Sequence, residues 1–258
     1  MELTFTKRRF ILSLAETRSI FFMDGLRLKD GRPTPYFVNL GRYSSGKYSY
    51  ELGSYFSELI VEKGLDKHVD IIVGPSYKGS AIAQAISICL FKEFGIDLPF
   101  DYDRKEIKVH GEATKLGSLF VNNHFFDGCR VLIVDDVLTS MATKYELLDK
   151  IKTLCQEKSM AVKVVALLIA VDREQVTAVY DKDGSVMLGV KGSDPIVDFK
   201  NNTGIEVYSI VGIREVVEYL YQEKIPVLVN DTIRPLDDSV KKTFDSYMEM
   251  YGVTRKCL

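Results

Sequence analysis

The stretch Arg130-Val-Leu-Ile-Val-Asp-Asp-Val-Leu-Thr139 decides the fold, because it joins a buried apolar run to two adjacent carboxylates. A continuous apolar run of this length is typical of a strand that is buried on both faces of a parallel sheet. The run is expected to end at the carboxylates, and a polar turn and a helical pattern over residues 145–154 follow it. The stretch therefore predicts one strand-helix unit of an open α/β sheet.

Asp135 and Asp136 are predicted to lie at the carboxyl end of this strand. Ligands of open α/β sheets bind at that edge, where the next helix presents free N–H groups that suit a phosphate. Carboxylates beside such a helix can accept hydrogen bonds from sugar hydroxyls, so the pair favours a phosphorylated sugar. The alternative is that an aspartate at a strand end only caps the following helix.

The overall composition is that of an ordinary globular protein. The 258 residues, with 46% hydrophobic and 27% charged side chains, allow one α/β domain or at most two small ones. A formal net charge of -2 gives no overall field that would recruit nucleic acid or an anionic membrane. We therefore expect neither partner, and any anion-binding site must be local.

The cysteines and the apolar segments favour a cytoplasmic protein. Glu16 and Arg18 interrupt the first apolar stretch too soon for a signal peptide, and the longest apolar run, residues 164–171, is far shorter than a bilayer span. The cysteines lie far apart without CxxC spacing, which indicates a reducing compartment with neither a zinc site nor a disulfide framework. They are Cys89, Cys129, Cys155 and Cys257.

Strand and helix patterns alternate along the chain, which predicts a mostly parallel central sheet flanked by helices. Helical periodicity covers residues 4–22, 48–63, 80–94, 145–158, 213–223 and 237–251. The other predicted strands are residues 69–73, 98–102, 162–171 and 206–211, and residues 28–39 are rich in turns. We expect a single domain, 1–258. Residues from about 65 to 215 would form the core sheet, and residues 1 to about 45, with C-terminal elements, a small hood.

A second strand end carries Gly74-Pro-Ser-Tyr77-Lys78-Gly79. Its glycines permit unusual backbone angles and a close approach of a ligand, and its N–H groups could face an anion. The alternative is an ordinary turn between a strand and a helix.

The segment after the predicted strand 98–102 is strongly basic. Four cationic or potentially cationic side chains fall within seven positions, and Gly111 and Gly117 could act as hinges. Such a segment could be a mobile lid that closes positive charge over a polyphosphate and excludes water. A solvated loop is the alternative. The four residues are Arg104, Lys105, Lys108 and His110.

Two further segments could recognise a flat, acidic base. Tyr36 and Phe37 could stack on a heterocycle with Lys29 adding a charge, although aromatic residues are more often core. Arg173 follows a third predicted strand and could bind a carboxylate with its planar fork of donors. The alternative is that Arg173 pairs at the surface with the neighbouring acid at 172 or 174.

Together these patterns place three strand ends, a basic lid and an aromatic flap on one face of the sheet, and the sequence resembles an orotate phosphoribosyltransferase over nearly its whole length. The Asp-Asp motif alone marks the wider phosphoribosyltransferase superfamily, whereas the basic loop and the YKG turn are specific. The matching segments are KDGRPTPYF at 29–37, GPSYKG at 74–79, DRKEIKVHGE at 103–112, VLIVDDVLTS at 131–140 and VDRE at 171–174.

The resemblance implies the type I phosphoribosyltransferase fold and a defined reaction. Orotate would attack C1 of 5-phosphoribosyl 1-diphosphate (PRPP), releasing pyrophosphate and forming orotidine 5'-phosphate for pyrimidine (UMP) biosynthesis. Mg²⁺ is implied, held mainly by substrate oxygens and water because this ion dehydrates reluctantly, so no protein metal ligands are expected. The family's lid reaches into the neighbouring subunit's site, which implies a homodimer that shares residues 104–116.

The resemblance also implies a role for each matching residue. Catalysis would fall to Asp135, Asp136, Lys105, Lys108 and His110. PRPP would be bound by Lys29, Tyr77, Lys78, Arg104, Lys105, Lys108, His110, Asp135, Asp136, Thr139, Ser140, Met141, Ala142 and Thr143. Orotate would be bound by Lys29, Tyr36, Phe37, Thr139 and Arg173.

The phosphate loop departs from the family pattern of a small residue, Gly, Thr or Ser, and Ala after Thr139. Met141 takes the glycine position and would be strained if the backbone there needs a positive φ angle. Ala142 lacks a hydroxyl expected to bond the phosphate. Two other functions therefore stay open: transfer to another base, which would have no carboxylate for Arg173 to meet, and a non-catalytic protein that senses PRPP, which would have less need of a basic lid.

Overall fold

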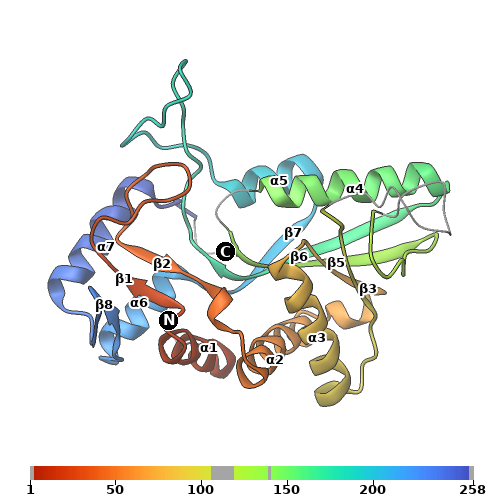
Figure 1. The fold of residues 1–258 in the computed structure, drawn as a ribbon, viewed down its shortest axis with the longest axis horizontal. Helices are drawn as coiled ribbons and strands as arrows, with labels where there is room; N and C mark the ends of the chain where they lie inside the picture. The colour runs from red at the N-terminus through yellow and green to blue at the C-terminus, as the bar shows by residue number, and fades with distance from the viewer. Residues whose placement is uncertain (1–2, 106–118, 139–140, 256–258) are drawn as a thin grey trace.

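The computed structural model describes residues 3–105, 119–138 and 141–255, and these form two sheets with helices around them (Figure 1). The larger sheet has the strand order β4-β3-β5-β6-β7, and every neighbouring pair is parallel. The prediction of a mostly parallel α/β sheet is therefore confirmed. The strands are β3 (Ile71–Gly74), β4 (Phe100–Tyr102), β5 (Cys129–Leu138), β6 (Val162–Asp172) and β7 (Glu206–Gly212).

Helices cover both faces of this sheet. One face carries α2 (Gly46–Glu62) and α3 (Lys78–Phe94), and the other carries α4 (Ala142–Lys158) and α5 (Pro195–Thr203) (Figure 1). All of these helices except α5 were predicted, α4 with a later start.

Each central strand contributes to two hydrophobic cores, because alternate residues of a strand point to opposite faces. On β5, Leu132 and Val134 belong to the core on the α2 and α3 side. Val131 and Ile133 belong to the core that contains α4. Burial on both faces explains why the strand reads as a continuous apolar run.

A smaller sheet joins distant parts of the chain. Its order is β2-β1-β8-β9, with β1 and β8 parallel and the other pairs antiparallel. We call this sheet, the loop 23–35 and the last helix, α7, the hood. The helices and strands on the hood side of the molecule, including α1 and α6 beside the hood, are α1 (Phe5–Glu16), β1 (Ile20–Phe22), β2 (Tyr36–Val38), α6 (Ile213–Gln222), β8 (Val227–Val229), β9 (Thr232–Arg234) and α7 (Asp238–Tyr251). Two 3-10 turns, residues Leu40–Arg42 and Leu65–Lys67, flank α2.

The prediction of helical structure up to residue 22 is wrong for its second part. The helix α1 ends at Glu16. The Thr17 hydroxyl donates to the Ser13 carbonyl at 2.7 Å, and Arg18 adopts a positive φ of 55°. A left-handed residue cannot continue an α-helix, so the chain turns into strand β1 instead.

The strand β5 is longer than predicted. The apolar run was expected to end at the two carboxylates, but the strand continues through them to Leu138. Asp135 is still paired with Ile169 of β6, and Leu138 with Asp172. The acids therefore lie within the last part of a paired strand, which holds their backbone in place.

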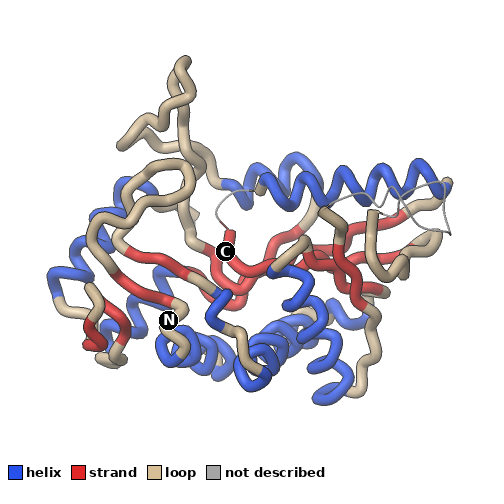
Figure 2. Tube along the Cα trace, in the orientation of Figure 1, coloured by secondary structure: helices blue, strands red, loops and turns tan. Residues whose placement is uncertain are grey.

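An arm of residues 177–193 projects from the molecule between β6 and α5 (Figure 2). At its base, the Thr177 N–H donates to the Ser193 carbonyl at 2.9 Å. Further along, the Gly189 N–H donates to the Tyr251 hydroxyl at 3.0 Å, which joins the arm to α7. The arm was not predicted, because its residues show neither a strand nor a helix period.

Among the described residues, no helix combines the length and the apolar character that a bilayer span requires. Cys89, Cys129 and Cys155 are free thiols, and Cys257 lies outside the described residues.

Candidate active site

The acid pair on β5 is held by two lysines from the helices on either side. The Asp136 carboxylate lies 2.8 Å from the Lys78 ammonium at the start of α3. Asp135 is ion-paired with Lys144 in the first turn of α4, and both of these side chains are buried. In the structure each acid therefore has one cation. The alternative that the acids only cap α4 is wrong for both, because the N-cap residue of the helix is Met141 and each acid is paired with a lysine.

Burial raises the pKa of Asp135, and the neighbouring Asp136 charge raises it further, while the Lys144 ammonium opposes both effects. Desolvation disfavours the charged form of a carboxyl group, and an adjacent like charge does the same. The ion pair with Lys144 is therefore what favours a charged Asp135 in this position.

A cleft of about 290 Å³ lies over the acid pair. Its walls come from the hood loop, the turn at 74–79, the end of β5 and the start of α4. The structure thus brings together six of the predicted site residues, with Lys144 as an addition. The six are Lys29, Tyr77, Lys78, Asp135, Asp136 and Thr143.

The glycines of the turn at 74–79 have a packing role. A Cβ atom on Gly74 would overlap the Gly79 carbonyl, and one on Gly79 would crowd Pro75. The strand β3 and the helix α3 therefore approach each other closely at these two residues. This close approach leaves Tyr77 and Lys78 exposed at the edge of the cleft.

The start of α4 can accept an anion. Its N-cap residue, Met141, makes no side-chain capping bond, and the first turn carries no acidic residue. Uncapped N–H groups and the positive end of a helix dipole favour a phosphate. Met141 has a φ of -85° and a buried side chain, so the strain that a positive φ would impose is absent. Ala142 is exposed beside it.

Arg173 lies buried just beyond β6, with an exposed fraction of 3%. Its guanidinium carbon is 4.7 Å from the centroid of the Tyr36 ring, and one terminal nitrogen donates to the Thr34 hydroxyl at 3.4 Å. Its Nε has no partner among the described residues. Surface pairing of Arg173 with its neighbours is wrong, because Asp172 pairs with Arg255 and Glu174 with Arg214.

The buried guanidinium has no carboxylate partner within the described ranges. A buried charge is costly unless it is paired and hydrogen-bonded. Arg173 therefore has the properties of a receptor for a ligand anion, and its planar donors suit a carboxylate.

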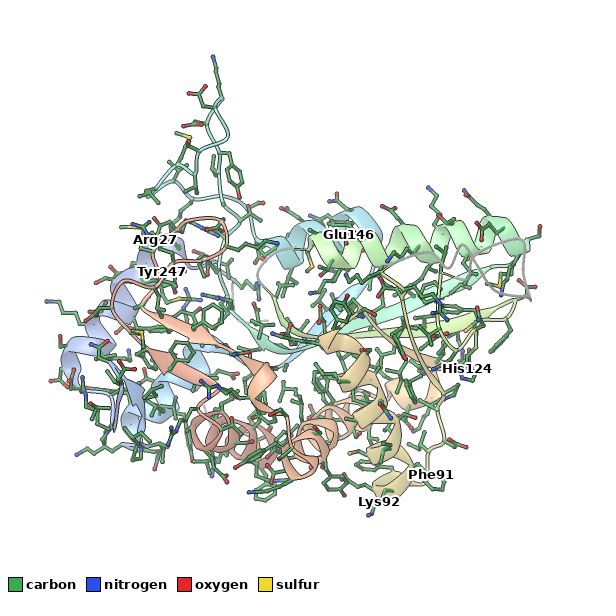
Figure 3. The ribbon with its side chains drawn as sticks, in the orientation of Figure 1. Arg27, Phe91, Lys92, His124, Glu146 and Tyr247 are labelled. Carbon is green, nitrogen blue, oxygen red and sulfur yellow. The ribbon has the colours of Figure 1, made fainter. Side chains whose placement is uncertain are left out.

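Tyr36 and Phe37 lie on opposite faces of β2. Tyr36 is fully buried beside Arg173 and packs edge-on against Phe244 and Tyr247 of α7, with ring centroids 5.5 Å and 5.9 Å away. Phe37 packs on Phe21, 5.7 Å away. Successive side chains of a strand point in opposite directions, so the structure places only Tyr36 beside Arg173. Figure 3 shows Tyr247 on the hood side of the molecule, which also carries Arg27.

Only the base of the predicted lid lies within the described residues. The Arg104 N–H donates to the Leu119 carbonyl at 2.8 Å, so the two ends of the basic segment lie side by side. The Arg104 carbonyl accepts a hydrogen bond from Lys150 of α4 at 2.9 Å, and Lys105 is exposed. The predicted site residues Lys108, His110, Thr139 and Ser140 lie outside the described residues.

A larger cavity of about 590 Å³ lies between α1, α6 and α7. Several of its charged side chains already pair with one another, including Lys241 with Glu218 and Asp245. It contains none of the predicted site residues. The cleft over the acid pair is therefore the better candidate for the active site, although it is smaller.

Sequence reasoning missed Lys144, Thr34 and Tyr247. A signal for Lys144 exists, because a lysine in the first turn of a helix opposes the helix dipole and calls for another explanation. Thr34 and Tyr247 carry no such signal. Thr34 contacts Arg173, and Tyr247 contacts Tyr36, only because the folded chain brings distant segments together.

Comparison with known proteins is decisive at the level of the family. The phosphoribosyl transferase domain family matches residues 49–187. An orotate phosphoribosyltransferase of Clostridium beijerinckii is 33% identical over 246 residues, covering 95% of this chain and 97% of the relative. The chain belongs to the orotate phosphoribosyltransferase family.

Other members of this family agree with the match. The orotate phosphoribosyltransferase of Bifidobacterium adolescentis is 31% identical over 248 residues, which are 95% of this chain and 96% of the relative. The 1.9 Å crystal structure of the Francisella tularensis orotate phosphoribosyltransferase superposes with a TM-score of 0.70 at 26% identity, covering 95% of this chain and all of that one. The predicted family and the type I phosphoribosyltransferase fold are therefore confirmed.

Proposed function

We propose that the protein transfers the 5-phosphoribosyl group of PRPP to orotate, forming orotidine 5'-phosphate and pyrophosphate for pyrimidine biosynthesis. The observation that carries this proposal is the buried Arg173, which has no carboxylate partner among the described residues. It follows strand β6, whose neighbour β5 carries the acid pair. Orotate brings a carboxylate, whereas a purine base does not, so the arginine favours orotate over another base.

The PRPP half of the site would work by positioning and electrostatics. Asp135 and Asp136 would accept hydrogen bonds from the ribose hydroxyls, and their charge would favour the positive charge that develops on the ring at C1. Lys78 and Lys29 border the same cleft and would meet the pyrophosphate. Thr143 and the N–H groups of α4 would hold the 5-phosphate.

The orotate half would orient the base by its polar edge. Arg173 would bind the carboxylate, and the Tyr36 ring would lie beside it. The lid residues Arg104, Lys105, Lys108 and His110 would neutralise the departing pyrophosphate. The family resemblance alone supports Thr139, Ser140 and Phe37 as further ligands.

Mg²⁺ belongs to the same proposal. Within the described ranges, no group of three or more His, Cys, Asp or Glu side chains is arranged to hold a metal ion. An ion that keeps most of its water and is held by the pyrophosphate and ribose oxygens of the substrate does not require such a group. When bound, Mg²⁺ would neutralise part of the charge on the pyrophosphate.

We further propose that the chain acts as one domain and as a cytoplasmic homodimer. One hydrophobic core contains residues of both sheets, including Phe22 of the hood and Leu168 of β6, which supports one domain. The dimer, in which residues 104–116 would reach the partner's site, rests on the family resemblance of the basic segment. The free thiols of Cys89 and Cys129 support a reducing location.

The test is orotate consumption in the presence of PRPP and Mg²⁺, followed by ultraviolet absorbance, with pyrophosphate release measured in parallel. We expect loss of orotate that depends on PRPP and matches the pyrophosphate formed. Turnover of adenine or hypoxanthine in place of orotate would contradict the proposed base. PRPP binding in calorimetry without turnover of any base would indicate a non-catalytic PRPP-binding protein.

A further inference from the structure

Lys144 holds an unusual position for a lysine. It is the third residue of α4, where its positive charge opposes the positive end of the helix dipole. Its side chain has an exposed fraction of only 4%, and burial of an ammonium group is unfavourable unless the group is paired. Neither the helix nor the core therefore explains a cation here, whereas the buried Asp135 carboxylate does.

The contacts of Asp135 leave its carboxylate able to accept a hydrogen bond from a ligand. Its Oδ2 is paired with Lys144, and its Oδ1 accepts the Asp136 N–H at 2.9 Å. A carboxylate oxygen can accept more than one hydrogen bond, so the ionised Asp135 can still accept from a ligand hydroxyl in the cleft. A protonated Asp135 would lose much of that capacity.

The two lysines at the acid pair differ in their exposure to solvent. The Lys78 side chain is 53% exposed at the mouth of the cleft, so it can leave Asp136 for a phosphate. Lys144 is enclosed and has no such alternative. When a polyphosphate draws Lys78 away, Asp136 becomes an unpaired charge beside Asp135, and Lys144 is then the cation that keeps both acids charged.

We propose that Lys144 is a positioning residue for PRPP, which keeps Asp135 ionised and oriented to accept a hydrogen bond from a ribose hydroxyl. This inference rests on the proposed function of the cleft. It adds a residue that would act on the sugar through Asp135.

Among the described residues, charged side chains from four elements surround Asp135 or border the same cleft. Lys144 comes from α4, Asp136 from its own strand, Lys78 from α3 and Lys29 from the hood loop. Burial and Asp136 both raise the pKa of Asp135, and Lys144 opposes them. Removing Lys144 should therefore raise this pKa further, so that activity is lost at acidic pH and recovers as the pH rises.

The experiment measures kcat/KM for PRPP, KM for orotate and the melting temperature from pH 5.5 to 9 for Lys144→Met, Lys144→Arg and Lys144→Gln. We expect Lys144→Met to lower kcat/KM for PRPP by ~10-fold for each unit by which the Asp135 pKa exceeds the assay pH. The loss should shrink toward pH 9, KM for orotate should change less than twofold, and Lys144→Arg should restore activity. Lys144→Gln gives the same readout if the Met variant does not fold.

Two controls separate this role from a structural one. Lys7→Met removes another lysine-carboxylate pair, with Glu215, away from the cleft and should leave the pH profile unchanged. Asp135→Asn combined with Lys144→Met should remove the pH dependence that the single Met variant gains. A loss of activity that is equal at every pH, or full activity in Lys144→Met, would overturn the inference. An inactive wild-type protein would instead refute the proposed function.

Discussion

The two halves of the candidate site differ in whether their charged side chains are paired. In the PRPP half, each acid already has a cation: Asp136 pairs with Lys78, and Asp135 pairs with Lys144. In the orotate half, the buried Arg173 contacts the Tyr36 ring and the Thr34 hydroxyl but no carboxylate among the described residues.

This difference indicates two modes of ligand binding. The PRPP half is neutralised in the free protein, so binding must exchange one ion pair for another, and the net gain is modest. In the proposed orotate half, Arg173 forms no ion pair with any of the described residues, so a ligand carboxylate would supply that partner. A ligand that binds only the folded state also stabilises it. Orotate binding should therefore depend mainly on Arg173, whereas PRPP binding should be spread over several residues.

Arg173→Ala should have the largest effect. Truncating one partner of a buried charge pair typically costs about 2–5 kcal/mol, so kcat/KM for orotate should fall on the order of 10²–10³-fold. PRPP affinity in calorimetry should stay within about twofold of the wild type. Arg255→Ala is the matched control, because it breaks the pair with the buried Asp172 and should lower stability without selective loss of orotate use. Equal losses for both substrates in Arg173→Ala would contradict the comparison.

Asp136→Asn should have the next largest effect, and it should fall on PRPP. The amide keeps the shape but removes the charge that is exposed when Lys78 moves to the substrate. We expect kcat to fall roughly 10²-fold, as for other groups that stabilise developing charge. Steady-state kinetics with either substrate varied provide the measurement. An unchanged kcat would mean that Asp136 serves only to hold Lys78.

Lys105→Ala should have a smaller effect, limited to turnover. Lys105 is exposed at the base of the predicted lid and forms no ion pair with any residue that the structure describes, so the free energy of unfolding should change by less than about 0.5 kcal/mol. Loss of one charge near the departing pyrophosphate should lower kcat about tenfold, or ~1.4 kcal/mol. Thermal melting and steady-state turnover test the two halves of this prediction, and unchanged turnover would identify the segment as a solvated loop.

Tyr36→Phe should have the smallest effect. The informative result is whether the free energy of unfolding rises or falls. The Tyr36 hydroxyl is buried without a hydrogen-bond partner among the described residues, and burial raises its pKa well above the usual value. Because an unsatisfied buried group costs stability, its removal should leave the free energy of unfolding unchanged or raise it by about 1 kcal/mol. Urea denaturation measures this. Tyr251→Phe is the control and should be destabilising, since that hydroxyl accepts the Gly189 N–H.

The strands that were predicted from the sequence are those whose hydrophobic pattern lies within the strand itself. The apolar runs of β5 and β6 specify buried strands by themselves, and topology then places their carboxyl ends at one edge. The strands of the hood are three residues long and carry no readable period. The strand β1 forms because β2 and β8 pair with it, which no local pattern in residues 17–22 indicates.

The candidate site divides in the same way. Asp135, Asp136 and Lys78 were predicted because each lies in a motif at a strand end. The isolation of Arg173 could not be predicted, because it depends on Asp172 and Glu174 having partners elsewhere. Neighbours in sequence are not sufficient to assign ion pairs.

The pairing of β1 with β8 and the packing of Tyr36 on α7 have a consequence for biosynthesis. A ribosome makes the chain from the N-terminus, so the strand that carries the acid pair and the two helices that carry its lysines emerge well before β8 and α7. The cleft for the sugar phosphate can be assembled while translation continues. The surroundings of Tyr36 cannot, since the α7 residues that pack on it are still to be synthesised. A nascent chain that stops before α7 would therefore carry the acid pair while Tyr36 still lacks the aromatic residues that pack on it.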